Sequence, residues 1–340
     1  MSNATWRLEH RPALDGLRGI AILLVVGGHA HWLPGPSSCA GVNLFFALSG
    51  FLITALLLDE AERRGRVSLP AFYGRRARRL LPALAVYLCA AAAFVGVVAT
   101  LPALLYAENW AMVVNGGAPG PTSIAWSLSV EEQFYLAWPL VVVAGARWGR
   151  LPWLVAVVGI VAAPVLRLLL WHGGAGWWRV YYGTGTRADV LLWGCLLALA
   201  VKRYGPSPWL RWALVPGAAA VAACCFAPQW WSVLLDPALI GVGEGAVIAA
   251  TLAGAGRWLA APVLRWFGQR SYALYLWHYV LVVEAHAGRL PMWAAVGVAL
   301  LLAEGSWRLV ESPFLRRRDG GPKQTIASPA GRTGDRPVLG

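Results

Sequence analysis

The sequence predicts an all-α membrane protein, a polytopic bundle of about ten transmembrane helices with both termini in the cytoplasm. Three observations predict this fold class. The 340 residues are 58% hydrophobic and 13% charged, which is too apolar for an ordinary soluble protein. They include 20 tryptophans, and tryptophan favours the interface between membrane and water. Apolar stretches of bilayer-spanning length also recur along the chain, separated by short basic segments.

The individual spans follow from the need for about 20 mostly apolar residues per crossing. The N-terminal residues show no short apolar core with a small-residue cleavage site, so we expect no removable signal peptide. We predict a membrane domain over 1–318 and, from its Gly, Pro and Arg content, a disordered cytoplasmic tail over 319–340. The ten predicted spans lie near 16–32, 41–58, 80–101, 125–146, 151–171, 188–201, 209–227, 233–254, 271–287 and 291–309.

The positions of the basic residues support this topology. With the N-terminus inside, all but four of the 29 Lys and Arg residues fall in cytoplasmic segments, as the positive-inside rule requires. The same placement explains the net charge of +13, so we expect a lipid bilayer as partner and no nucleic acid. The five cysteines lie mostly in apolar runs without metal-like spacing, and we therefore expect no metal site. The four basic exceptions are Arg167, Arg179, Arg187 and Arg289.

The first apolar stretch, "GLRGIAILLVVGGHAHW", carries Arg18 near its cytoplasmic end and His29 in its middle or outer half. Eleven positions on an α-helix put both residues on one face, roughly 16 Å apart. One interpretation is a snorkelling arginine and a core histidine bonded to a neighbouring helix. The other is a functional pair, because ionisable groups within spans usually mark function.

Further polar groups are predicted at similar depth. Ser49 lies about halfway along the second span, and Glu131 and Glu132 lie near the start of the fourth. His278 falls within the ninth span. A histidine oriented by a carboxylate can act as general base on a hydroxyl. For Ser49 the adjacent glycine favours close helix packing instead.

An arginine-dense segment, "FYGRRARRLLP", comes just before the third predicted span. Its four guanidiniums, on Arg75, Arg76, Arg78 and Arg79, satisfy the positive-inside rule. They also suit a phosphorylated ligand, because arginine pairs bidentately with phosphate oxygens. Both interpretations stay open at this point.

Together these stretches resemble the acyltransferase-3 family of integral membrane O-acyltransferases, which includes bacterial polysaccharide O-acetylases and macrolide 3-O-acyltransferases. The resemblance runs from about Arg11 to Phe314 and depends on the order and spacing of short motifs. These are "LDGLRGIAILLVVGGH" with Arg18 and His29, "FFALSGFLI" with Ser49, "RRARRLLP", "WSLSVEEQFYL" with Glu131, "RADVLLWG" with Asp189, "GQRSYALYLWH" with Ser271, Tyr272 and His278, and "ESPF" with Glu311.

The resemblance implies transfer of a small acyl group, often acetyl, from acyl-CoA on the cytoplasmic side to a hydroxyl of a sugar, glycolipid, polysaccharide or macrolide. It implies acetyl-CoA or another acyl-CoA as cosubstrate, no permanently bound cofactor, and a multi-pass protein of the bacterial cytoplasmic membrane. His29 would act as general base or accept the acyl group itself, and Glu131 would orient its imidazole. The candidate site residues are His29, Glu131 and Arg18 for catalysis, Arg75, Arg76 and Arg79 for donor binding, and Ser49, Glu132, Asp189, Ser271, Tyr272 and His278 in support.

A secondary transporter or exporter is the main alternative, because buried His and Glu residues can also relay protons. No inverted repeat is visible in the sequence, and the arginine-dense segment fits a CoA-type donor better. A non-catalytic scaffold would leave the polar residues in the membrane unexplained.

Overall fold

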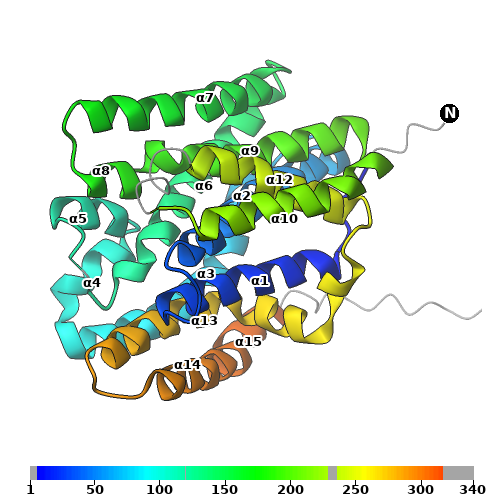
Figure 1. Ribbon diagram of the computed structural model, residues 1–340. Helices are drawn as coiled ribbons and strands as arrows, with labels where there is room; N and C mark the ends of the chain where they lie inside the picture. Colours follow the sequence, from blue (N-terminus) through cyan, green and yellow to red (C-terminus); the bar gives the residue numbers. More distant parts are fainter. Residues whose placement is uncertain (1–5, 119, 229–235, 317–340) are drawn as a thin grey trace, which may run out of the picture.

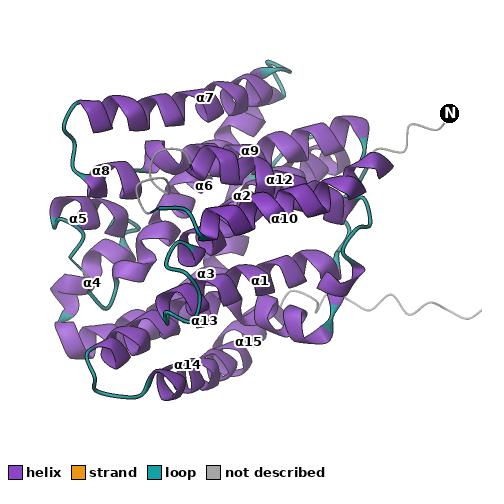
Figure 2. Cartoon of the chain, viewed as in Figure 1, coloured by secondary structure: helices purple, strands orange, loops and turns teal. Residues whose placement is uncertain are grey.

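The computed structural model describes residues 6–118, 120–228 and 236–316, and these form helices and turns with no strand among them (Figures 1 and 2). Within these ranges seven helices are long and apolar enough to cross a membrane, or eight if a bent pair counts as one span. The all-α membrane class is therefore confirmed. The count of ten spans and the cytoplasmic termini stay predictions, and the tail predicted over 319–340 lies outside the described residues.

Each of the ten predicted apolar stretches coincides with a helix, although 233–235 of the eighth fall outside the described part. The third stretch divides between two helices, since α3 ends at Val95 and α4 follows. In chain order the α-helices are α1 (Pro12–His29), α2 (Ser37–Arg64), α3 (Leu69–Val95), α4 (Val97–Leu104), α5 (Glu108–Val114), α6 (Trp126–Gly145), α7 (Leu151–His172), α8 (Trp177–Tyr182), α9 (Thr184–Tyr204), α10 (Leu214–Cys225), α12 (Asp236–Leu252), α13 (Pro262–His286), α14 (Met292–Ser306) and α15 (Ser312–Arg316).

Two helices that carry predicted site residues, α6 and α13, are not among the seven that pass on length and hydropathy. Both are long enough, but α6 contains Glu131 and Glu132, and α13 contains Arg270 and His278. Polar side chains of this kind lower the mean hydropathy of a helix. A simple hydropathy count therefore loses α6 and α13, although it keeps α1 and α3, which also carry predicted site residues.

Helices α1 and α2 form the centre of the bundle. Helix α1 packs against α13 and α2, and α2 packs against α9. Glycine allows the close approach of α13 to α1 and of α2 to α9. A Cβ added to Gly268 of α13 would lie 1.8 Å from the Asp15 carbonyl oxygen, and one added to Gly50 of α2 would lie 1.9 Å from the Leu191 carbonyl oxygen. Close helix packing was predicted at Ser49 and the adjacent glycine, and Gly50 is the residue that makes this contact.

Helix α7 lies at the edge of the bundle, at the top of Figure 1. Only 17% of its most apolar window is buried, against 72% for α2. Leu154, Val161 and Leu169 of α7 are among its exposed apolar side chains. An apolar surface of this kind is suited to contact with lipid chains.

Three short helices, α4, α5 and α8, gather at one end of the bundle, on the left in Figure 1. The axes of α4 and α5 differ by 118° across a short break. Helices α5 and α8 lie outside the ten predicted spans and α4 begins within the third, so three separate short helices are an addition to the predicted architecture.

Candidate active site

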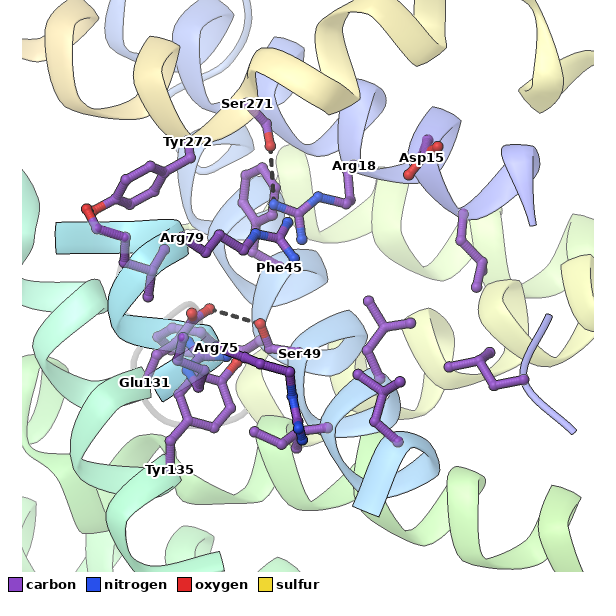
Figure 3. Close-up of a pocket in the computed structure, with 18 of the residues that line it drawn as sticks. Asp15, Arg18, Phe45, Ser49, Arg75, Arg79, Glu131, Tyr135, Ser271 and Tyr272 are labelled. Carbon is purple, nitrogen blue, oxygen red and sulfur yellow. Dashed lines mark hydrogen bonds between the residues drawn. The ribbon is translucent and has the colours of Figure 1, made fainter. Parts of the chain in front are cut away.

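A cavity of about 530 Å³ lies between α1, α2, α3, α6 and α13 (Figure 3). Its walls combine aromatic and aliphatic side chains with an unusual number of cations. Six of the lining residues are arginines: Arg11, Arg18, Arg63, Arg75, Arg76 and Arg79. All the arginines that the sequence singled out for donor binding therefore face one volume.

Three of these arginines come from the N-terminal half of α3. The helix begins at Leu69, where the Ser68 hydroxyl accepts a hydrogen bond from the Ala71 N–H at 3.4 Å. The arginines thus lie on a helix, and not in a loop ahead of a span starting near residue 80. Helical periodicity explains their division, because Arg75, Arg76 and Arg79 line the cavity whereas Arg78 donates to the Gly74 carbonyl and does not.

Two of the α3 arginines are held by carboxylates. Arg75 Nη2 donates to Glu60 Oε2 at 2.8 Å, and Arg76 Nη2 donates to Glu132 Oε1 at 2.6 Å. The Arg76 guanidinium carbon also lies 3.5 Å from the centroid of the Tyr135 ring. These contacts fix two planar guanidiniums at the cavity wall and leave some of their N–H groups for another partner.

Arg18 and Arg79 face the cavity without a carboxylate partner. Arg18 Nη2 donates to Ser271 Oγ at 3.1 Å, and its guanidinium carbon lies 5.6 Å from the Phe45 ring centroid. Arg79 has no hydrogen bond or ion pair with any residue that the structure describes. Figure 3 shows both guanidiniums close together in the pocket. Two uncompensated cations beside a void form a site for an anionic group.

Glu131 lies on the cavity wall, where Ser49 Oγ donates to its Oε1 at 3.1 Å. The prediction that Glu131 orients the His29 imidazole is therefore wrong in its geometry. Glu131 sits five residues into α6 beside the middle of α2, whereas His29 is the last residue of α1. The imidazole is held by His278 instead.

The cavity runs along α2 from Arg63 to Val42, about 30 Å at 1.5 Å per residue. Arg63 lies at the end of α2 next to the arginine-rich start of α3. At the far end the hydroxyls of Ser127 and Tyr275 hydrogen-bond to each other at 2.5 Å. The cavity therefore reaches from the basic end of the bundle deep into its interior.

His278 follows Tyr275 by one turn of α13, and the two ring centroids are 5.9 Å apart. His278 is fully buried and its Nε2 lies 3.0 Å from Nδ1 of His29, which is half-buried. His286 Nε2 donates to the His29 backbone carbonyl at 2.9 Å. A pair of imidazoles thus stands just beyond the inner end of the arginine-lined cavity.

The remaining predicted residues divide between the cavity and the bundle core. Ser271 and Tyr272 line the cavity, and the Tyr272 hydroxyl donates to the Leu80 carbonyl at 3.1 Å. Asp189 lies elsewhere, where it accepts two hydrogen bonds from Arg167 at 2.7 and 3.1 Å within the bundle. Asp189 therefore has a structural partner and does not line the site.

The site also contains residues outside the predicted set: Ser127, Tyr135 and Tyr275 belong to the motifs that carry the resemblance, and Glu60 was missed. Glu60 pairs with Arg75, Tyr135 stacks under Arg76, and Ser127 and Tyr275 form the inner end. Two signals were present in the sequence. Glu60 is an acid at the cytoplasmic end of the second predicted span, and Tyr275 precedes His278 by three residues, which places them on one helix face.

Residues 11–303 match the acyltransferase-3 family, described as an acyltransferase domain. A protein of Listeria monocytogenes named peptidoglycan O-acetyltransferase OatA is 32% identical over 355 residues, which cover 92% of this chain and 56% of that protein. A Bacillus subtilis protein named putative peptidoglycan O-acetyltransferase YrhL is 31% identical over 359 residues, with the same coverage.

A putative O-acetyltransferase of Staphylococcus aureus is 28% identical over 360 residues and is covered to 58% of its length. The chain thus spans little more than half the length of these curated relatives. No solved structure matches the chain. The match over most of the sequence confirms the predicted resemblance, and this multi-pass membrane protein belongs to the acyltransferase-3 family.

Proposed function

We propose that this chain is a membrane O-acyltransferase that transfers an acetyl or other small acyl group from acyl-CoA to an acceptor hydroxyl, with His29 as general base. The observation that carries this proposal is the arginine-lined cavity, whose inner end lies one helical turn from the His278–His29 pair. Family membership favours a transferase over the transporter considered from the sequence.

The shape and charge of the cavity support an acyl-CoA donor. CoA combines phosphate groups at one end with a long, thin arm that ends in the thioester. The arginines lie toward the basic end of the bundle, and the cavity continues along α2 for about 30 Å. Arg18 and Arg79 would pair with phosphate oxygens, and the fixed guanidiniums of Arg75 and Arg76 would add further N–H donors. Glu131, held by Ser49, offsets part of this positive charge.

The proposed reaction is a direct acyl transfer. The acceptor oxygen forms a bond to the thioester carbon while the His29 imidazole takes the hydroxyl proton. The carbon–sulfur bond then breaks, and the CoA thiolate recovers the proton from the imidazolium. The products are the acyl ester of the acceptor and CoA with its free thiol.

The proposed acceptor is a hydroxyl of a sugar, glycolipid, polysaccharide or macrolide, and the proposed location is the bacterial cytoplasmic membrane. Two relatives carry the name peptidoglycan O-acetyltransferase, which makes a cell-wall glycan fragment the first acceptor to test. A macrolide is the second.

The test uses purified protein in nanodiscs with radiolabelled acetyl-CoA, and follows thioester loss with and without acceptor. His29→Asn is compared with His31→Asn, the same substitution two residues further along. We expect His29→Asn to lose about 10²–10⁴-fold of turnover, the usual contribution of a general base, and His31→Asn to retain it. Asn tolerates the left-handed backbone of position 31, where φ is 57°.

Turnover in well-expressed His29→Asn equal to wild type would exclude His29 as base or nucleophile. Wild-type protein that neither binds acetyl-CoA nor consumes the thioester would overturn the acyltransferase proposal and favour the transporter.

A further inference from the structure

Both ring nitrogens of His278 are hydrogen-bonded, although the side chain is fully buried. Its Nδ1 lies 2.9 Å from the Leu274 carbonyl oxygen, one turn earlier on α13. Its Nε2 lies 3.0 Å from Nδ1 of His29 on α1. The ring is therefore fixed at both edges, by its own helix and by the proposed general base.

These two contacts determine where the protons lie. A backbone carbonyl can only accept, so His278 Nδ1 must carry a hydrogen. In a neutral imidazole the other nitrogen then has the lone pair, and His278 Nε2 can only accept. The contact with His29 consequently requires a hydrogen on His29 Nδ1, which leaves the lone pair of that ring on Nε2.

The arrangement of the two rings fits this hydrogen bond. The ring planes are tilted by only 15° and their centroids are 5.3 Å apart, with the two bonded nitrogens 3.0 Å apart. Rings that meet edge to edge in nearly one plane direct the N–H along the line to its acceptor. Nε2 of His29 has no hydrogen-bond partner in the parts of the chain that are described.

We infer that His278 is a positioning residue that holds neutral His29 as the Nδ1–H tautomer and so makes His29 Nε2 the atom that accepts the proton from the acceptor hydroxyl. This inference rests on the proposed role of His29 as general base. Neutral histidine otherwise exchanges between two tautomers, and only one of them presents a basic Nε2. The Leu274 carbonyl, His278 and His29 form a chain in which each group sets the proton position of the next.

The protons in this series of hydrogen bonds also balance through the reaction. When Nε2 takes the hydroxyl proton, the acceptor oxygen bonds to the acyl carbon and the bond to sulfur breaks. The imidazolium keeps its Nδ1–H bond to His278, so that His278 stays neutral, and the proton on Nε2 passes to the CoA thiolate. His278 itself exchanges no proton and touches no substrate in this scheme.

The direct test is solid-state NMR of the protein labelled with ¹⁵N-histidine in bilayers, because protonated and bare ring nitrogens have well-separated shifts. The chain has six histidines, so the spectrum of His29→Asn identifies the signals of His29 by difference. We expect a protonated Nδ1 and a bare Nε2 for His29 in neutral wild-type protein. A protonated Nε2 with a bare Nδ1 would overturn the inference.

A kinetic test compares His278→Gln with His278→Leu. Both variants lose the bond to the Leu274 carbonyl, but Gln retains an acceptor oxygen near the position of Nε2 and Leu does not. We expect kcat to fall about 100-fold in His278→Leu and within about 10-fold in His278→Gln, by analogy with the 10–100-fold cost of losing a partner that orients a metal-ligating histidine. The KM for acetyl-CoA should stay within two-fold in both, because His278 does not line the donor cavity.

Equal kcat values for the two variants, or a fall that appears mainly in the donor KM, would contradict the positioning role. If His278→Leu does not fold, the NMR experiment on wild-type protein still decides the question. Turnover that does not depend on His29 would overturn the proposed function, whereas dependence on His29 with the opposite tautomer would overturn this inference alone.

Discussion

Two sites in the described part of the bundle, the Arg167–Asp189 pair and the arginine-lined cavity, differ in whether each guanidinium has a carboxylate partner. Arg167 and Asp189 form a closed pair with side chains 1% and 0% exposed, and Arg167 Nη1 also donates to the Thr186 carbonyl at 2.6 Å. In the cavity, by contrast, Arg18 and Arg79 face an open volume without a carboxylate partner. A charge within a membrane span indicates a binding site only where the fold leaves it uncompensated beside a void.

The largest expected effect comes from breaking the closed pair. Asp189→Leu leaves Arg167 buried without its carboxylate, and the free energy of unfolding should fall by about 3–5 kcal/mol. Thermal unfolding in detergent measures this loss. The double variant Arg167→Leu/Asp189→Leu should recover most of the stability, because it removes both charges. A single variant as stable as wild type would show that the pair is not a structural element.

Arg79→Gln should act on donor binding and leave stability unchanged, because Arg79 has no partner to lose among the residues that the structure describes. One charge-assisted hydrogen bond is worth about 1.5–3 kcal/mol, so the KM for acetyl-CoA should rise about 10–100-fold. Arg78→Gln, one residue away on the outer side of α3, is the matched control and should leave that KM unchanged. An equal effect of the two substitutions would assign both arginines to membrane anchoring.

Arg76→Lys should have a smaller effect. The charge remains, but the planar fork and its contact with the Tyr135 ring at 3.5 Å are lost. A cation–π contact is worth about 0.5–2 kcal/mol, which corresponds to a rise of about 2–30-fold in the donor KM. Steady-state kinetics with saturating acceptor would measure it. An unchanged KM would mean that Arg76 contributes charge alone.

The smallest effect is expected from salt. Raising the ionic strength from low values to about 0.15 M shortens the screening length to about 8 Å, and the donor KM should rise about 2–3-fold. The rise should be smaller in Arg79→Gln, which has one cation fewer in the cavity. Equal salt dependence in both proteins would indicate that screening acts on groups outside the cavity.

The sequence predicted the fold class well because hydropathy is a local property. Each predicted apolar stretch lies on a helix, and the start of α3 was readable from Ser68 and the following Leu69–Pro70. The break between α3 and α4, at Gly96 with φ of 81°, and the bend between α4 and α5, at Tyr106 with φ of 52°, were not predicted. Hydropathy alone carries no signal for a left-handed residue within an apolar stretch.

The residues that line the site were predicted better than the contacts between them. Arg18 was selected from its place in an apolar span and Arg75, Arg76 and Arg79 from the family resemblance, and all four line one cavity. Glu131 was assigned the wrong partner because rotation and depth of neighbouring helices are set by tertiary contacts. Arg187 illustrates the same limit. It was predicted outside the spans, but it is 2% exposed within α9, where its Nε donates to the Tyr181 carbonyl.

The contacts between α1 and α13 also determine which helices can move. The two helices touch backbone to backbone at Gly268, are joined midway by Arg18 and Ser271, and are joined again at the far end by His29 with His278 and His286. Contacts at three levels hold α1 and α13 together along their length. A sliding movement of α1 along α13 would therefore have to break contacts at all three levels at once.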